Sequence, residues 1–107
     1  MTTLEALKAA RALIADPSHW TQGALARNAR GNRVRPWSEH AVRWCAEGAS
    51  IRVCGPNFGL RGRLVGVLFG DGADAPWVVN DDQGHAAVLA MYDRAIAAEQ
   101  ARQEGTA

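Results

Sequence analysis

The stretch PWVVNDDQGHAAVLAMYDRAI, residues 76–96, decides much of the fold because it joins a polar cluster to the most regular apolar pattern in the chain. After that cluster, apolar residues recur three and four positions apart, at Val88, Leu89, Tyr92, Ala95 and Ile96. This spacing places them on one face of a helix. We predict a helix from about residue 83 to residue 103, preceded by a short extended segment at residues 77–79.

The polar cluster in this stretch has three interpretations. Asp81 or Asp82 can accept a backbone N–H at the start of the last helix and interact favourably with the positive end of its dipole. The sequence NDDQGH lacks the alternating oxygen ligands of a calcium loop, so a metal site has less support. A catalytic or partner-binding acid is the third interpretation. We favour helix capping and expect no bound metal.

Length and composition set the class of protein. The chain has 107 residues, of which 48% are hydrophobic and 21% are charged, which is typical of one globular domain with a core of its own. No apolar run is long enough to span a membrane, and charged residues interrupt the first helix where a signal peptide would be apolar. We expect a single domain at 1–107 with a frayed end at 104–107, located in the cytoplasm.

Two further helices are predicted from capping signals. Thr2, with Glu5 three residues later, fits a capping box, and the helix that it opens should end at Asp16-Pro17. Ser38 is a good N-cap for another helix, which Gly55-Pro56 would close.

The remaining segments suggest one hairpin and one more helix. Residues 20–36 suit a short β-hairpin, because Leu25 and Val34 flank the turn-like sequence NARGN. Residues 60–69 combine leucines at helical spacing with a strand-like alternation, and we favour a short helix. The predicted fold is therefore α+β, a small single domain of three to four helices with one short β-hairpin and a short extended segment.

Charge is distributed unevenly along the chain. Residues 1–63 contain ten basic and four acidic residues, a net charge of +6, whereas residues 64–107 contain two basic and seven acidic residues, a net charge of −5. Around the predicted hairpin, arginines stand beside aromatic residues, a pattern that suits phosphate contact and base stacking. These candidate binding residues are Arg27, Arg30, Arg33, Arg35, Trp20 and Trp37. A solvated, charge-protected hairpin edge explains the same arginines without a ligand.

The two cysteines offer a second candidate site. On one continuous helix, Cys45 and Cys54 would stand about 13 Å apart, too far for a disulfide, and no Cys or His pair has zinc-finger spacing. The simplest interpretation is that Cys45 is a small buried apolar residue in mid-helix. The alternative is a catalytic Cys45–His85 dyad whose imidazole is oriented by Asp81 or Asn80.

Three blocks of the sequence carry a resemblance to a known family. They are WTQGALARNARGNRV (20–34), AVRWCAEGA (41–49), and WVVND (77–81) followed by HAAVLAMYDRAIA (85–97). Together they resemble the successive blocks of a small bacterial and phage family, domain of unknown function 6197, although Val78 and Val79 here separate a tryptophan from Asn-Asp that the family usually has adjacent. The resemblance implies a single domain and supplies no activity, cofactor or catalytic residue.

Two functional hypotheses follow from these patterns. We favour a non-enzymatic binding module that uses the basic hairpin and the tryptophan surface to engage a protein or an anionic polymer such as nucleic acid, without a cofactor and without a membrane. The alternative is a small enzyme built on Cys45, His85 and Asp81. The two differ in whether the cysteine and histidine side chains meet in a cleft.

Overall fold

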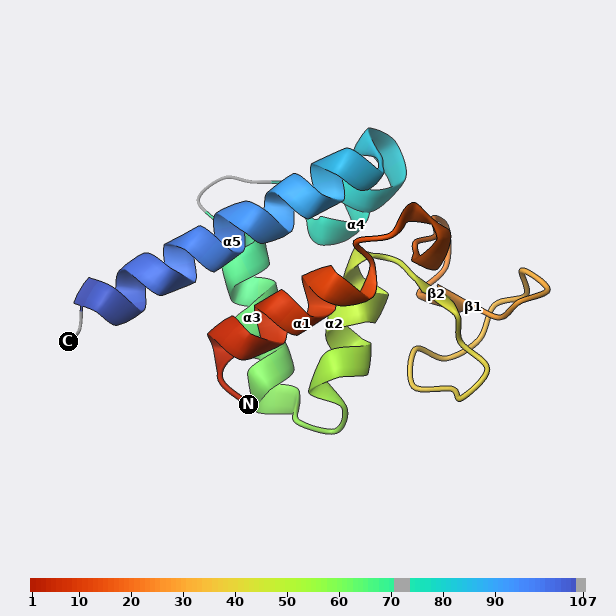
Figure 1. Cartoon of the computed structure of the whole chain (residues 1–107), viewed down its shortest axis with the longest axis horizontal. Coiled ribbons are helices and arrows are strands. Elements are labelled where there is room, and N and C mark those ends of the chain that lie inside the picture. The colour runs from red at the N-terminus through yellow and green to blue at the C-terminus, as the bar shows by residue number, and fades with distance from the viewer. Residues whose placement is uncertain (71–73, 106–107) are drawn as a thin grey trace.

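The computed structural model describes residues 1–70 and 74–105 (Figure 1). Its first helix, α1 (Thr3–Leu13), begins at the predicted capping box: the Thr2 hydroxyl accepts from the Glu5 N–H at 3.0 Å, and the Glu5 carboxylate accepts from the Thr2 N–H at 2.8 Å. A single 3₁₀ turn, η1 (Pro17–His19), follows, with Asp16 as its cap. The predicted end of this helix at Asp16-Pro17 is confirmed to within a few residues.

The β structure is a two-stranded antiparallel ribbon of β1 (Ala26–Arg27) and β2 (Arg43–Trp44). The turn predicted at residues 28–32 is present, since the Asn28 N–H donates to the Asn32 carbonyl at 2.9 Å. The strand that pairs with β1 nevertheless comes later than expected. Ala26 lies opposite Trp44, whereas residue 33 contributes only an isolated bridge to Arg27.

The helix predicted from Ser38 begins eight residues later, as α2 (Ala46–Cys54). The Ser38 hydroxyl does accept a backbone N–H, but that of His40 at 3.1 Å, so it closes a turn and does not open a helix. Backbone groups of the following residues are used by the ribbon, because the Val42 N–H donates to the Arg27 carbonyl at 2.9 Å. A backbone N–H that donates to a neighbouring strand cannot at the same time donate within a helix.

The ambiguous segment at residues 60–69 is helical, as favoured. Helix α3 (Phe58–Phe69) starts at Asn57, whose side chain accepts from the Leu60 N–H at 3.0 Å. Its three buried residues are leucines four positions apart, at 60, 64 and 68. The helical spacing of the leucines therefore outweighs the strand-like alternation in the same segment.

The short extended segment predicted at residues 77–79 is wrong. Those residues lie in α4 (Pro76–Val78) and in the π-helical turn η2 (Val79–Gln83), which Gly84 ends with a φ of 95°. The last helix, α5 (His85–Gly105), matches the predicted range within two residues at each end. Residues 104 and 105, predicted to fray, are helical, and residues 106–107 lie outside the described part.

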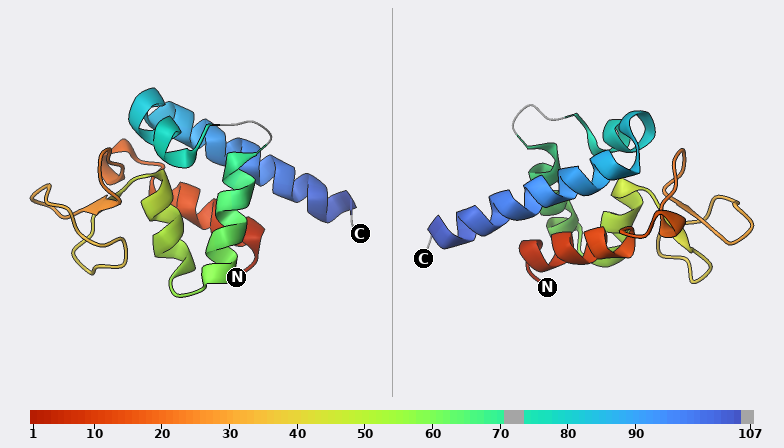
Figure 2. Two further views of the ribbon diagram at one scale, coloured as in Figure 1. Left: turned by 180° about the vertical axis from the view of Figure 1, so that it is seen from behind. Right: turned by 45° about the horizontal axis from the view of Figure 1, so that its top comes forward.

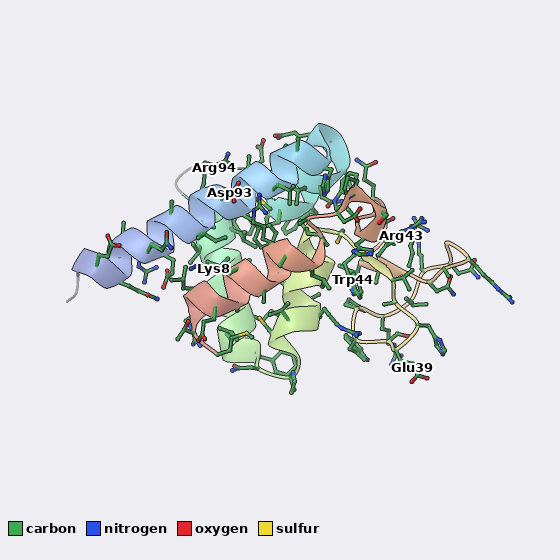
Figure 3. All side chains as sticks on the ribbon, viewed as in Figure 1. Lys8, Glu39, Arg43, Trp44, Asp93 and Arg94 are labelled. Atoms are coloured by element: carbon green, nitrogen blue, oxygen red, sulfur yellow. The ribbon has the colours of Figure 1, made fainter. Side chains whose placement is uncertain are left out.

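Within the described residues, five α-helices form, one or two more than predicted, and they share one core. Helix α1 contacts α2, α3 and α5. Its surface is also tied to α5 by an ion pair from Arg11 Nε to Asp93 Oδ1 at 2.6 Å. Figure 3 labels Asp93 on α5. The largest fully buried apolar side chains are Leu7, Ile14, Leu64, Val88, Met91 and Tyr92.

The ribbon and its loops lie at one end of the long axis, and the C-terminal half of α5 extends from the other (Figures 1 and 2). This arrangement separates the arginine-rich loops from the C-terminal helix. No helix in the described ranges has both the length and the apolar character required to cross a membrane.

Candidate functional site

Asn80 is the centre of the polar network that joins the loops to the helices. Its side chain is 1% exposed. The side-chain oxygen accepts from Trp20 Nε1 at 2.6 Å and from the Ala46 N–H at 2.9 Å, and the amide nitrogen donates to the Thr21 carbonyl and to Asp81 Oδ1, both at 3.0 Å. One side chain thus connects the segment after η1, the start of α2 and the turn η2.

Asp81 belongs to the same network and does not cap the last helix. Its carboxylate accepts from the Gly23 N–H at 3.2 Å as well as from Asn80. Gln22 adds bonds from its amide nitrogen to the carbonyls of Asn80 and Asp81, at 3.0 and 3.3 Å. The predicted capping of α5 by Asp81 or Asp82 is therefore wrong, because both precede Gly84 and lie in the first turn of η2.

Cys45 stands at the N-terminus of α2 and not in mid-helix as predicted. Its sulfur accepts from the Gly48 N–H at 3.2 Å, so the cysteine itself is the N-cap. Burial raises the pKa of the Cys45 thiol, although the backbone N–H groups at the helix start act in the opposite direction. The neutral thiol is favoured, which opposes a nucleophilic role. Cys45 and Cys54 are both buried and unbridged, as expected.

His85 is engaged away from Cys45. Its Nε2 lies 2.7 Å from the Ile14 carbonyl oxygen, and its ring packs against Trp20 with centroids 5.2 Å apart. Since a carbonyl only accepts, this contact requires the proton on Nε2 and holds the ring toward the end of α1. Within the described residues no hydrogen bond joins His85 to Cys45.

A hollow of about 210 Å³ lies beside Cys45 and also contacts Glu47, Trp77 and Asp81. The two carboxylates raise the thiol pKa further. Among the described residues that line it, the hollow therefore places two carboxylates and no cation beside a thiol whose neutral form is favoured. This chemistry does not activate a nucleophile.

The predicted binding arginines separate into two groups. Arg27 turns inward, where its guanidinium donates to Thr21 Oγ1 at 3.0 Å, to the Gly31 carbonyl at 2.9 Å and to the Gln22 carbonyl at 3.1 Å. The other three, Arg30, Arg33 and Arg35, are exposed. Trp20 is half-buried and its indole N–H donates to Asn80, so it too stabilises the fold.

Trp37 is the predicted aromatic residue that remains on the surface. It is 60% exposed and lines two adjoining hollows. The first, of about 440 Å³, is lined by Trp37, Ile51, Gly55, Pro56, Phe58 and Arg61. The second, of about 420 Å³, includes Leu25, Arg33, Val34, Arg35 and Pro36. We call the surface formed by these residues the Trp37 face.

The backbone around Trp37 is fixed by two buried or half-buried side chains. Arg52 Nη1 donates to the carbonyls of Pro36 and Ser38 at 3.2 and 2.9 Å, and Trp44 Nε1 donates to the Pro36 carbonyl at 3.0 Å. The Arg52 guanidinium also lies 5.5 Å from the centroid of the Trp44 ring. Figure 3 shows Trp44 where the loops meet α2, with Glu39 at their outer edge.

The sequence analysis named Trp37, Arg33 and Arg35 as candidate binding residues, and it did not name Phe58, which lines the same face. Phe58 is 75% exposed, the most exposed large apolar side chain among the described residues. It lies at the start of α3, more than twenty positions after Trp37, and no local pattern connects the two.

Comparison with known proteins identifies the family and no activity. No curated protein and no solved structure matches this chain. The family described as "Family of unknown function (DUF6197)" matches residues 1–98, which include every element from α1 through most of α5. The chain therefore belongs to this family, as the three sequence blocks predicted.

Proposed function

We propose that the protein is a non-enzymatic binding module whose Trp37 face holds an acidic protein segment. One apolar side chain of that segment inserts into the first hollow of the face. The observation that carries this proposal is the pair Trp37 and Phe58. These two large, exposed aromatic side chains come from a turn and from the start of α3, and they border the same hollow of about 440 Å³. An apolar hollow with a few polar groups at its rim is typical of a binding site.

The floor of this hollow is suited to an apolar anchor. Ile51, which is 4% exposed, and Pro56 line the hollow together with the two aromatic residues. An aliphatic or aromatic side chain of a partner would remove these surfaces from water. Such burial contributes about 25 cal/mol per Å² of apolar area.

The rim of the Trp37 face favours negative charge. Arg61 lines the first hollow and Arg33 and Arg35 line the second. The Arg35 guanidinium lies 5.8 Å from the centroid of the Trp37 ring, so a partner carboxylate bound there would meet a cation already placed on the aromatic surface. An acidic segment is the complementary partner.

A protein segment is favoured over single-stranded nucleic acid. Nucleic acid requires a continuous track of free cations along the backbone. Two arginines that would extend such a track, Arg27 and Arg52, are already bonded to backbone carbonyls. Moreover, the first hollow is a concave apolar recess, which receives a side chain better than a stacked base.

The enzyme hypothesis has less support. Asp81, Cys45 and His85 each hold another part of the fold through their polar atoms. A catalytic triad requires the same atoms for one another.

The test is a fluorescence anisotropy titration with a labelled peptide of alternating glutamates and leucines. We expect it to bind more tightly than a serine-for-leucine peptide, a glutamine-for-glutamate peptide and a labelled oligothymidylate. Trp37→Ala and Phe58→Ala should each weaken binding by about tenfold or more. Trp77→Ala, which removes a 51% exposed tryptophan outside the face, is the matched control.

Charge is tested separately. The double change Arg33→Gln and Arg35→Gln should weaken binding and reduce its loss between about 50 and 200 mM salt. Arg94→Gln, on the exposed side of α5, should leave both unchanged. Equal binding of the acidic and glutamine peptides, or tighter binding of the oligothymidylate, would contradict the proposal.

A further inference from the structure

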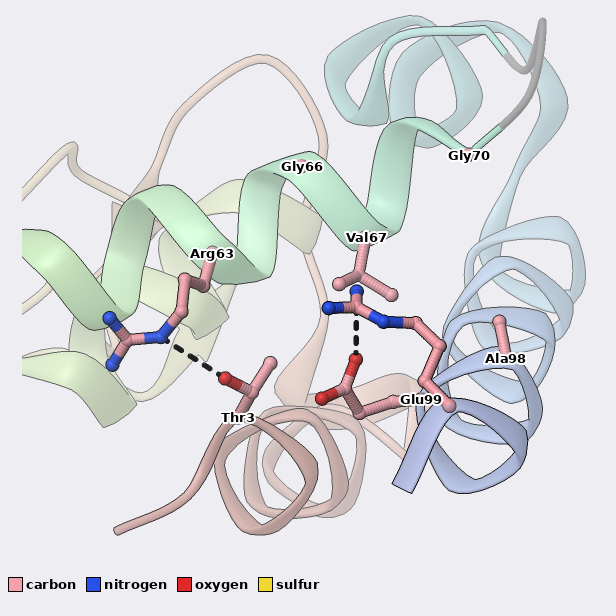
Figure 4. Close-up of a pocket in the computed structure, with 8 residues that line it drawn as sticks. Thr3, Arg63, Gly66, Val67, Gly70, Ala98 and Glu99 are labelled. Atoms are coloured by element: carbon pink, nitrogen blue, oxygen red, sulfur yellow. Dashed lines mark hydrogen bonds and ion pairs between the residues drawn. The ribbon is translucent and has the colours of Figure 1, made fainter. Parts of the chain in front are cut away.

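A hollow of about 540 Å³ lies between the start of α1, the middle of α3 and the C-terminal half of α5 (Figure 4). Its charged side chains already have partners in the chain. Arg102 Nη1 lies 3.3 Å from Glu99 Oε2, and Arg63 Nε donates to the Thr3 hydroxyl at 3.2 Å. Charged groups without such partners stand beside exposed apolar side chains at the Trp37 face and next to it.

The Trp37 face continues into the hollow beside Cys45, because Ala24 and Leu25 line both that hollow and the second hollow of the face. The hollow beside Cys45 adds Trp77, which is 51% exposed, to the exposed Leu25, Trp37 and Phe58 of the face. Four of the six large apolar side chains that are exposed among the described residues thus lie along one connected surface. A connected exposed apolar surface marks an interaction site.

Carboxylates occupy the end of this surface that carries Trp77. Glu47 is half-buried and forms no hydrogen bond or ion pair with a described residue. Asp81 accepts from Gly23 and Asn80 through Oδ1, so its Oδ2 is free of bonds to the described chain. We call Trp77, Glu47 and Asp81 the Trp77 end of the surface.

Guanidinium groups occupy the other end. Arg33, Arg35 and Arg61 line the two hollows of the Trp37 face, and none of them forms an ion pair within the described ranges. Each end therefore has an exposed tryptophan, and the two ends carry unpaired charges of opposite sign.

Such a surface is complementary to a second copy of itself related by a two-fold axis. In that arrangement Trp77 of each copy meets Trp37 and Phe58 of the other, and the carboxylates of each copy face the arginines of the other. Leu25, which joins the two ends, lies near the axis. Every contact forms twice, once on each side of it.

We propose that the chain forms this isologous dimer, with Trp77 of each copy in the first hollow of the other copy's Trp37 face. The inference rests on the proposed function, because the Trp77 end is an acidic segment with an apolar side chain, the kind of ligand proposed for that face. The dimer occupies the Trp37 face, so a second copy and an acidic partner compete for it.

Sedimentation velocity of the full chain, from about 10 µM to about 1 mM at about 50 mM salt, measures the association. We expect the weight-average mass to rise toward twice that of one chain and to stop there, since an isologous contact is closed. Added salt should weaken the dimer by screening its charges. Growth beyond two chains, or the mass of one chain at every concentration, would overturn the proposal.

Two variants test the pairing of the tryptophans. Trp37→Ala and Trp77→Ala each remove both copies of the contact from their own dimer, so each dimer should dissociate about tenfold more readily or worse. A mixture of the two variants restores one intact contact per pair and should associate more tightly than either variant alone. Arg94→Gln, at an exposed position on α5, should dimerise as the wild type does. Unchanged dimers in the single variants, or no recovery in the mixture, would contradict the pairing.

The indole N–H signals of the ¹⁵N-labelled wild type give a readout that needs no variant. With rising concentration the signals of Trp37 and Trp77 should shift. Those of Trp20 and Trp44 should stay, because their N–H groups already donate to Asn80 and to the Pro36 carbonyl. Shifts confined to the latter pair, or no shifts, would refute the dimer.

The acidic peptide separates this inference from the proposed function. Trp77→Ala keeps the Trp37 face, so it should bind that peptide at least as tightly as the wild type. Peptide binding without dimer formation would overturn only the dimer, whereas absence of both would overturn the proposed function as well.

Discussion

Replacing Asn80 by alanine should destabilise the protein more than any change at an exposed site. The variant removes the acceptor of two buried or half-buried donors, Trp20 Nε1 and the Ala46 N–H, and the donor to the Thr21 carbonyl. Because Asn80 is 1% exposed, water can replace the lost partners only if the three segments separate.

The magnitude follows from the two orphaned donors. A buried donor left without a partner costs about 1–3 kcal/mol, so the loss of partners for two donors should lower the free energy of unfolding by about 2–6 kcal/mol. That is a large part of the 5–15 kcal/mol typical of a domain. The midpoint of thermal unfolding should fall by about 10 °C or more.

Guanidinium denaturation followed by tryptophan fluorescence measures this loss. Asp82→Ala is the control, since it lies two positions away, is exposed, and should change stability by less than about 0.5 kcal/mol. Asn80→Asp keeps the acceptor but places a carboxylate beside Asp81. Its loss should therefore be greater at neutral pH than in acid, where the new group is protonated. A loss below about 1 kcal/mol for Asn80→Ala would refute the view that this side chain holds the three segments together.

Three further changes test separate contacts. Gly48→Ala should cost several kcal/mol or prevent folding, because its Cβ would lie 1.9 Å from the Leu25 carbonyl oxygen; thermal unfolding measures this. Tyr92→Phe should cost about 1 kcal/mol near neutral pH through loss of the bond to a buried carbonyl. Burial raises the pKa of Tyr92 above its ordinary value, so the stability of the wild-type protein should fall as the pH rises above about 10. In that range the difference in stability between the wild type and Tyr92→Phe should shrink, which denaturation at several pH values measures. Arg52→Gln should loosen the turn that carries Trp37, seen as about tenfold faster hydrogen exchange of the Ser38 amide with unchanged exchange in α1.

Local signals predicted the helices whose ends are set by neighbouring residues. The box at Thr2 and Glu5 and the leucines of α3 act within one or two turns, and both helices form. Ser38 carries an equally good local signal, yet no helix starts there. The backbone that follows it pairs with β1, and that pairing depends on a strand eighteen positions earlier in the chain. A contact of this range has no local signature.

The same limit applies to the candidate site. Trp37 and its arginines form one sequence cluster, so they could be predicted together. Phe58 joins them only because the end of α2 and the start of α3 bring it to the same hollow. Likewise, the position of Cys45 at a helix start could not be known while the start of that helix was assigned to Ser38.

Several residues that carry the family resemblance hold the loops and helices together. Trp20, Gln22, Asn80 and Asp81 form the polar network, and Gly48 admits the Leu25 carbonyl beneath α2. Such residues are replaceable by few others, because each satisfies a buried donor or a close backbone approach. A pattern made of them identifies the architecture and leaves the ligand open. The chemistry that distinguishes this protein is therefore to be sought on surfaces whose side chains the network does not use, such as the Trp37 face.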